Sequence, residues 1–157
     1  MKFIADAMLG TLARWMRILG YDTLYARDIS DDEIIELARK EGRIIISRDQ
    51  ALCKKIEGSI LMNGTQLTLQ IHQVMNQYFP DKMSILTRCI ECNSMLESMG
   101  KSQAAGKVPP TVFEIRDEFW QCPDCRRIYW KGTHYHNMLA EAEKLFCEFV
   151  NNPQRDS

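Results

Sequence analysis

Short apolar runs alternate with amphipathic helical segments over the first half of the chain. The clearest strand is Arg43–Ser47, where three consecutive isoleucines, branched at Cβ, favour an extended segment buried on both faces. Lys2–Ala5, Asp22–Tyr25 and Ser59–Met62 are shorter predicted strands. Because helical patterns separate these strands, the order is βαβ, which is typical of a mostly parallel sheet flanked by helices.

Helices are predicted where apolar residues recur three and four positions apart. They are Met8–Leu19, residues 31–41, Ala51–Ile56 and Thr65–Phe79. Either Ser30 or Asp31 can cap the second of them, and Ser30 with Glu33 fits a capping box. Gly42 suits a helix end with positive φ, and Pro80 ends the last helix.

The second half of the chain carries different chemistry. Cys89 and Cys92 form one Cys-x-x-Cys pair, and Cys122 and Cys125 form another. Four thiolates suit a tetrahedral structural zinc, and two such pairs fit zinc better than a redox dithiol. A site closed by four cysteines leaves no position for substrate, so we expect the zinc to stabilise a segment with little core of its own.

With 157 residues, the chain is long enough for one domain or two small ones. The change in chemistry predicts an α/β domain over residues 1–80 and a zinc ribbon with a C-terminal helix over 81–157. That helix is predicted at Met138–Val150, and the polar stretch Ser98–Gly106 is predicted to be a flexible insertion. Cys53 and Cys147 stand alone in helical patterns and are predicted to be ordinary buried residues.

Composition narrows the function classes. The chain is 45% hydrophobic and 26% charged, as in soluble globular proteins, and its net charge of −1 means that any nucleic-acid surface must be local. No apolar run approaches membrane-spanning length, and the N-terminal apolar segment is too short for a signal peptide. We therefore expect a cytoplasmic protein with no membrane partner, in which paired cysteines stay reduced and bind metal.

Acidic residues follow two of the predicted strands. Asp6 comes after the first strand and Asp49 after Arg43–Ser47. Open α/β sheets bind ligands outside the carboxyl ends of their strands, and carboxylates there suit hard divalent cations. Plainer interpretations stay open, because Asp49 also fits as a helix cap and the acids at 31–33 fit as complements to a helix dipole.

Cations and aromatic residues alternate after the second cysteine pair. They are Arg126, Arg127, Tyr129, Trp130, Lys131, His134, Tyr135 and His136. Such a mixture supplies phosphate contacts and stacking platforms for RNA bases. It fits equally well an amphipathic strand whose Tyr129 and Trp130 pack on the first domain.

Four stretches together resemble a known family. They are FIADAMLGTLARWMRILGYD (3–22), RIIISRD (43–49), RCIECN (88–93) and CPDCRRIYWKGTHY (122–135). They resemble the PIN-like ribonuclease family first described at the C terminus of the Mut-seven exonucleases, over nearly the entire chain. The resemblance implies a PIN-like α/β domain, a mostly parallel sheet flanked by helices, followed by a small four-cysteine zinc ribbon. It also implies a metal-dependent nuclease that acts on RNA.

The resemblance assigns roles to individual residues. The implied catalytic acids, which would bind Mg²⁺ or Mn²⁺, are Asp6, Asp31 and Asp49. The implied phosphate-binding residues are Arg14, Arg17 and Arg48. The implied zinc ligands are Cys89, Cys92, Cys122 and Cys125. The predicted RNA contacts, which come from the alternation of cations with aromatics, are Tyr129, Trp130, Lys131 and His134.

Single-stranded or looped RNA is the expected substrate, because its bases are open to stacking. Asn63, after the last predicted strand, can take the place of a fourth metal ligand. The alternative is a non-catalytic RNA- or protein-binding zinc-ribbon module, and a protein inhibitor or other protein partner is a further expectation.

Overall fold

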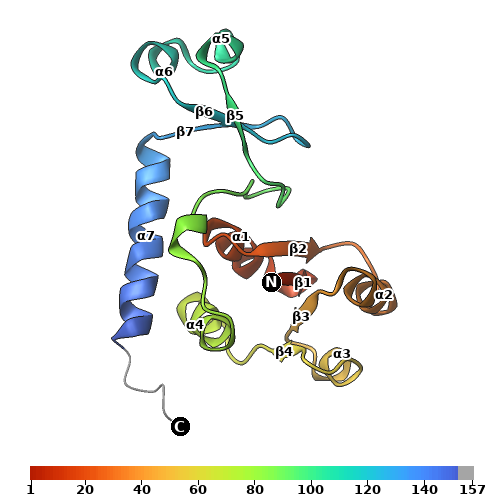
Figure 1. Cartoon of the computed structure of the whole chain (residues 1–157). Helices are drawn as coiled ribbons and strands as arrows, with labels where there is room; N and C mark the ends of the chain where they lie inside the picture. The colour runs from red at the N-terminus through yellow and green to blue at the C-terminus, as the bar shows by residue number, and fades with distance from the viewer. Residues whose placement is uncertain (152–157) are drawn as a thin grey trace.

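The computed structural model describes residues 1–151 of the chain, apart from the side chain of Met83 (Figure 1). Within these residues the strands form a parallel sheet of order β2-β1-β3-β4 and an antiparallel sheet of order β5-β6-β7. The strands of the parallel sheet are β1 (Lys2–Asp6), β2 (Asp22–Ala26), β3 (Ile44–Ser47) and β4 (Ile60–Leu61). Those of the antiparallel sheet are β5 (Glu97–Met99), β6 (Phe119–Gln121) and β7 (Ile128–Trp130).

Helices cover the parallel sheet and fill the connections of the antiparallel one. They are α1 (Gly10–Ile18), α2 (Asp31–Glu41), α3 (Gln50–Lys54), α4 (Leu67–Gln77), α5 (Lys101–Ala104), α6 (Pro110–Ile115) and α7 (Thr133–Val150), with 3₁₀ turns η1 (Ala7–Leu9) and η2 (Lys82–Ser84). Among the described helices, none has both the length and the apolar character that crossing a membrane requires.

Side chains of the parallel strands alternate between two helical layers. Phe3 and Ile46 lie in a core shared with α1, α4 and α7, whereas Ile4 and Ile45 lie in a core shared with α2 and α3. This alternation is the period-two pattern of a strand, so each strand is buried on both faces. The predicted α/β class, a mostly parallel sheet flanked by helices, is confirmed.

Local signals at α2 are confirmed as well. Ser30 is the N-cap, and its side chain and that of Glu33 form the predicted capping box. Gly42 ends the helix with φ of 64°. The loop into β3 is therefore set by residues next to it in the chain, which is why sequence alone located it.

The C-terminal helix is longer than predicted and packs on the parallel-sheet unit. It begins at Thr133 rather than Met138, because the polar residues of its first turns are largely exposed and hide the helical period. In Figure 1 α7 runs from the antiparallel sheet down beside α4. Leu145 and Phe146 of its apolar face complete the core that contains Phe3.

Two predictions for the second half are wrong. The stretch Ser98–Gly106 is not a flexible insertion, because it contributes to β5 and forms α5, and Ala104 is fully buried beside Phe119 in a small separate core. Cys147 is exposed, because the buried face of α7 consists of Ala142 and the apolar residues at 145, 146 and 149.

Candidate functional site

Four cysteine side chains gather on residues 87–132, called the ribbon from here on. The Sγ atoms of Cys89, Cys92, Cys122 and Cys125 all lie within 4.8 Å of one another, and each thiol is free. Cys89 Sγ and Cys125 Sγ are 3.7 Å apart. A tetrahedral zinc with bonds of about 2.3 Å places its sulfur ligands roughly 3.8 Å apart. The quartet therefore fits a structural zinc, as predicted.

Each cysteine pair lies on a matching backbone turn. Asn93 follows the first pair with φ of 72°, and Arg126 follows the second with φ of 62°. The N–H of Asn93 donates to the carbonyl of Cys89 at 2.9 Å, and that of Arg126 donates to the carbonyl of Cys122 at 3.1 Å. A left-handed backbone costs a non-glycine residue about 1–2 kcal/mol, which these hydrogen bonds offset.

The protein favours the thiolate of Cys89 over those of Cys92 and Cys122. Burial by itself raises the pKa of Cys89, but hydrogen bonds from the Tyr129 hydroxyl, 3.2 Å from Sγ, and from the N–H of Cys92 bring this pKa below its ordinary value. Burial is the largest effect on Cys92 and Cys122, and it raises both of their pKa values. Four thiolates this close need a cation between them, which is what zinc would supply.

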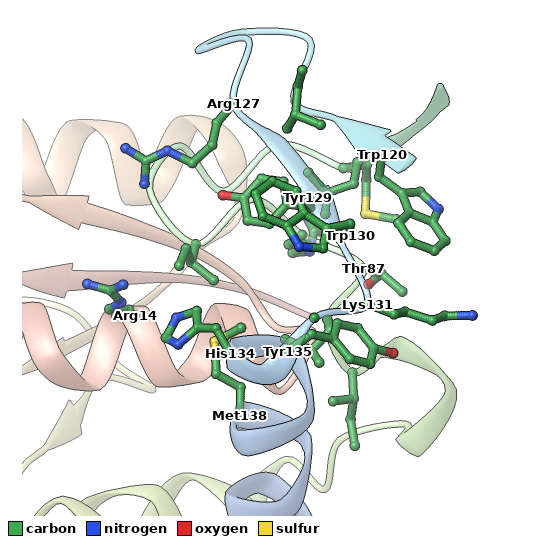
Figure 2. Close-up of a pocket in the computed structure, with 18 of the residues that line it drawn as sticks. Arg14, Thr87, Trp120, Arg127, Tyr129, Trp130, Lys131, His134, Tyr135 and Met138 are labelled. Carbon is green, nitrogen blue, oxygen red and sulfur yellow. The ribbon is translucent and has the colours of Figure 1, made fainter. Parts of the chain in front are cut away.

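A cavity of about 660 Å³ lies between the ribbon, α1 and the first turns of α7 (Figure 2). This ribbon pocket is lined by Arg14 of α1, by Arg127, Tyr129 and Trp130 of the ribbon, by His134 and Tyr135 of α7, and by further, mostly apolar residues. All four predicted RNA contacts thus line one cavity. Among them, Lys131 extends away from Trp130 in Figure 2, and its Nζ pairs with Glu118 at 2.7 Å.

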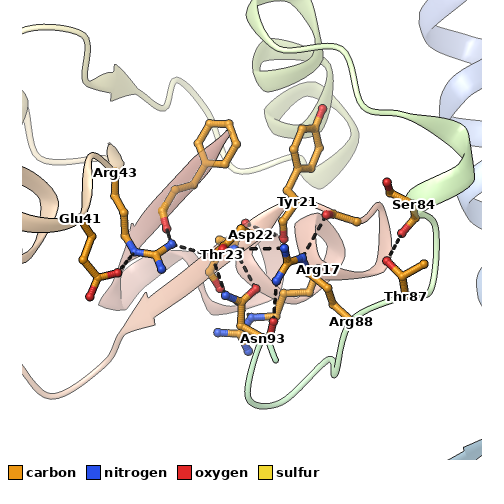
Figure 3. Close-up of polar contacts among 12 residues, drawn as sticks. Arg17, Tyr21, Asp22, Thr23, Glu41, Arg43, Ser84, Thr87, Arg88 and Asn93 are labelled. Carbon is orange, nitrogen blue, oxygen red and sulfur yellow. Dashed lines mark hydrogen bonds and ion pairs between the residues drawn. The ribbon is translucent and has the colours of Figure 1, made fainter. Parts of the chain in front are cut away.

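A buried arginine joins the ribbon to α1 (Figure 3). Arg17 is only 6% exposed, and its guanidinium donates to the carbonyls of Thr23 at 2.8 Å, Ile90 at 3.0 Å and Glu91 at 2.7 Å. All three acceptors are backbone oxygens, and two of them lie within the first cysteine pair. The Arg17 side chain is not available to a phosphate, which corrects the phosphate-binding role predicted for it.

An acidic residue at the start of β2 completes this junction. Asp22 accepts hydrogen bonds from Arg43 at 2.6 Å and from the side chain of Asn93 at 2.8 Å, and Arg88 lies 3.7 Å from its other oxygen. Burial by itself raises the pKa of Asp22, but the hydrogen bonds and the two positive charges outweigh it and bring the pKa below its ordinary value. Asn93 also accepts from the N–H of Thr23, so the first cysteine turn is fastened to the edge of the parallel sheet.

Two of the predicted catalytic acids lie at the opposite end of that sheet. Asp6 is the last residue of β1 and Ser47 the last of β3, and these strands are neighbours. The Ser47 hydroxyl donates to Asp6 Oδ2 at 2.7 Å and accepts from the N–H of Asp49 at 2.9 Å. The structure thus brings Asp6 and Asp49 to one edge, called the carboxylate rim from here on.

Both aspartates also bind backbone N–H groups. Asp6 Oδ1 accepts from Ala7, and Asp49 Oδ1 accepts from Ala51 at 2.6 Å and Leu52 at 3.2 Å, which confirms the interpretation of Asp49 as the cap of α3. An ionised carboxylate has about four lone-pair sites, so each aspartate keeps acceptor positions for a cation.

The third predicted acid is placed differently. Asp31 is the first residue of α2, is exposed, and is not the cap, since Ser30 has that position. Among the described residues, the cysteine quartet is the group of three or more potential ligands whose atoms all lie within 4.8 Å of one another. Asp6, Asp31 and Asp49 do not form such a group, so metal binding at the carboxylate rim stays a prediction.

Sequence reasoning missed two residues near the carboxylate rim. Ser47, which links the two aspartates, is visible in the sequence only as the residue two positions before Asp49. Asp28 follows β2, whose last residue Ala26 pairs with Asp6. An acid after each of β1, β2 and β3 was the available signal, but the order of β2 beside β1 was needed to interpret it.

Comparison with known families gives one match that spans both parts of the molecule. The Mut7-C RNAse domain model matches residues 1–142. The chain belongs to this family. No curated protein and no solved structure is similar enough to count as a match. Membership of the Mut7-C RNAse family covers both the parallel-sheet unit and the ribbon, and it indicates a ribonuclease-like role.

Proposed function

We propose that this Mut7-C RNAse domain is a metal-dependent ribonuclease that hydrolyses RNA phosphodiester bonds at the carboxylate rim. The observation that carries the proposal is the shared Ser47 hydroxyl, which binds the Asp6 carboxylate and the backbone N–H of Asp49 at the carboxyl ends of β1 and β3. Ligands of open α/β sheets bind at this edge, and oxygen donors suit Mg²⁺ or Mn²⁺. A cation there would supply a water of lowered pKa and would neutralise charge on the attacked phosphate.

The chain's own residues then have distinct tasks. Asp6 and Asp49 hold the cation through the carboxylate oxygens that the backbone N–H groups do not occupy. Asp31, exposed at the start of α2, is the proposed third ligand, and Asn63 after β4 is the proposed fourth. Arg48, exposed beside Asp49, would orient a phosphate through its planar guanidinium.

The proposed substrate is single-stranded or looped RNA, and the proposed place of action is the cytoplasm. A cytoplasmic location is consistent with six free thiols, since this compartment keeps thiols reduced. The zinc of the ribbon has a structural task, because four cysteines leave no open coordination position.

The test is cleavage of a labelled RNA with Mn²⁺ by the zinc-loaded protein and by two charge-neutral variants. Asp49→Asn keeps the cap of α3, because asparagine caps helices as well as aspartate does, and Asp6→Asn keeps an acceptor for Ala7. We expect each variant to lose at least a hundredfold in rate, whereas Glu36→Gln, on the exposed side of α2, keeps full activity. Equal rates in all four proteins would reject the proposal.

A second candidate function rests on a different observation. Asp49 has a complete structural task as a helix cap, and the ribbon pocket is lined with cations and aromatics, as expected of a non-catalytic module that binds RNA or a protein. Such a module would bind RNA without cleaving it and would lose nothing in Asp6→Asn or Asp49→Asn. The cleavage experiment therefore separates the two functions.

A further inference from the structure

The ribbon pocket is remote from the carboxylate rim. The ribbon is fastened to Asp22, the first residue of β2, whereas Asp6 pairs with Ala26, the last. The length of β2 between them is roughly 13 Å. Arg14 lies midway along α1, a helix that begins beside Asp6 and ends near Gly20, where the ribbon is attached. A chain that contacts both sites would therefore run along α1.

The lining of the ribbon pocket is complementary to a polyanion. Of the described residues that line it, none is aspartate or glutamate, whereas the cations include Arg14 and Arg127. Both guanidinium groups share one carboxylate, since Glu91 lies 3.8 Å from Arg14 and 2.9 Å from Arg127. The two arginine side chains are 50% and 51% exposed, and one negative charge between them leaves positive charge in excess.

The N-terminus of helix α7 adds a positive electrostatic potential at the ribbon pocket. Its N-cap is Gly132, which offers no side chain to the first-turn N–H groups. Those groups and the helix dipole favour an anion at this end of an 18-residue helix. His134 and Tyr135, both in the first turn, line the ribbon pocket with Arg14 (Figure 2).

Aromatic side chains supply part of the wall of the ribbon pocket. Trp130 borders the ribbon pocket on one side and a second cavity of about 600 Å³ on the other. The second cavity contains Lys107 and Arg126, and again no acidic residue among its described lining. A Cβ on Gly132 would lie only 2.8 Å from Nε1 of Trp130, so the glycine makes room for the indole in its present position.

We propose that the ribbon pocket is an RNA-binding subsite for an unpaired stretch of the substrate away from the scissile bond, an inference that rests on the proposed ribonuclease function. Bases stack on Trp130 and Tyr135, and the flanking phosphates bind Arg14 and Arg127. Stacking on aromatic faces accepts any base, so the subsite selects single strands rather than a sequence. A duplex keeps its bases stacked inside and does not enter a concave pocket of this size.

Substitutions of Glu91 and Arg14 are expected to change the affinity for RNA in opposite directions. A phosphate that binds Arg14 and Arg127 displaces the Glu91 carboxylate, so this carboxylate competes with RNA. Glu91→Gln removes the competing charge and leaves the backbone carbonyl that Arg17 binds. The variant is therefore expected to bind RNA several-fold more tightly, whereas Arg14→Ala binds more weakly.

The experiment measures fluorescence anisotropy of a labelled oligouridylate with zinc-loaded protein carrying Asp6→Asn, without added Mg²⁺ or Mn²⁺. Tyr135→Ala is expected to weaken binding by about tenfold. Arg14→Ala is expected to reduce the slope of log K against log salt by roughly 0.7, the value for one phosphate contact on a single strand. Lys144→Ala, a cation farther along α7 that pairs with Glu148, is the matched control and should bind unchanged.

Zinc content and a thermal melt of each variant show that it is folded. Unchanged affinity in Tyr135→Ala, Arg14→Ala and Glu91→Gln would overturn the subsite, whatever the cleavage assay shows. An oligoglutamate peptide that binds as tightly as the RNA and weakens in the same variants would overturn it in favour of a protein-docking surface. Loss of cleavage with intact, pocket-dependent RNA binding would reject the ribonuclease function alone.

Discussion

The hydroxyl of Ser47 donates a hydrogen bond to Oδ2 of Asp6 across 2.7 Å, and Oγ of Ser47 accepts a hydrogen bond from the N–H of Asp49 at 2.9 Å. A single buried side chain thus contacts the carboxylate of Asp6 and the backbone of Asp49, two residues that are far apart in the sequence. This relationship is the reason for placing the reaction at the carboxylate rim.

Ser47→Ala tests that relationship. The change removes the donor to Asp6 and leaves the N–H of Asp49 without its partner, so it should destabilise the protein by about 1–3 kcal/mol. It should also reduce the rate of RNA cleavage by at least tenfold, because the Asp6 carboxylate loses its donor and the backbone of Asp49 loses its acceptor. Rate and denaturant stability are measured together, with Ser59→Ala, whose hydroxyl only donates to the Ile56 carbonyl, as the control. A destabilised Ser47→Ala with an undiminished rate would separate the serine from the chemistry.

Arg17 and Arg14 should behave differently, although the sequence gives them the same role. Arg17→Ala leaves three buried or partly buried carbonyls without a donor and is expected to cost about 3 kcal/mol of unfolding free energy. Arg14→Ala should change stability by less than about 0.5 kcal/mol, because its side chain is half exposed. Urea denaturation of both variants measures the contrast. Similarly small losses of unfolding free energy in the two variants would show that Arg17 does not hold the ribbon to α1.

Zinc removal should destabilise the parallel-sheet unit as well as the ribbon. The first cysteine turn binds Arg17 and Thr23, so its loss frees groups that support α1 and β2. Cys89→Ser is therefore expected to lower the zinc content to near zero and the melting temperature by roughly 10 °C. Differential scanning calorimetry with a zinc assay measures both. Cys147→Ser, at an exposed thiol, is the matched control, and a melting temperature unchanged in Cys89→Ser would contradict the coupling.

Asp22 predicts a specific pH dependence. Its folded-state pKa lies below the ordinary value of 3.8, since Arg43, Asn93 and Arg88 outweigh the effect of burial. Its contribution to stability is therefore complete above that ordinary value and is lost as pH falls through the lower folded pKa. Asp22→Asn should cost about 2 kcal/mol at neutral pH, and the difference from wild type should shrink below about pH 3.8.

Denaturant titrations of the two proteins from neutral to acidic pH give this difference directly. Because zinc loss at low pH affects both proteins, only the difference between them is interpreted. Asp117→Asn, at an exposed acid paired with Lys101, provides the control and should show a small difference at every pH. A difference for Asp22→Asn that is constant with pH would exclude the ionised carboxylate as the source.

Sequence located the elements whose signals are local. The isoleucines of β3, the capping box of Ser30 and Glu33, and the two cysteine pairs each depend on residues within a few positions of one another. They located β3, the start of α2 and the four clustered cysteines with little error. The family resemblance rests on the same stretches, and the match over residues 1–142 confirms it.

What sequence missed depends on distant contacts. Arg17 looks like a surface cation, but its partners at Ile90 and Glu91 lie more than 70 residues away. Asp28 follows the end of β2, and only the pairing of β2 with β1 puts that end beside Asp6. The exposure of Cys147 was within reach, because the apolar positions at 142, 145, 146 and 149 already define the opposite face of the helix.

Binding of Mn²⁺ to the zinc-loaded protein tests the central claim most directly. Titration calorimetry, with zinc measured in the same samples, should reveal an EDTA-sensitive Mn²⁺ site in addition to the zinc held by the cysteines. Asp6→Asn should weaken that site by at least tenfold without loss of zinc, and Glu36→Gln should leave it unchanged. Equal Mn²⁺ binding by wild type and Asp6→Asn, or no binding by either, would contradict a catalytic metal at the carboxylate rim.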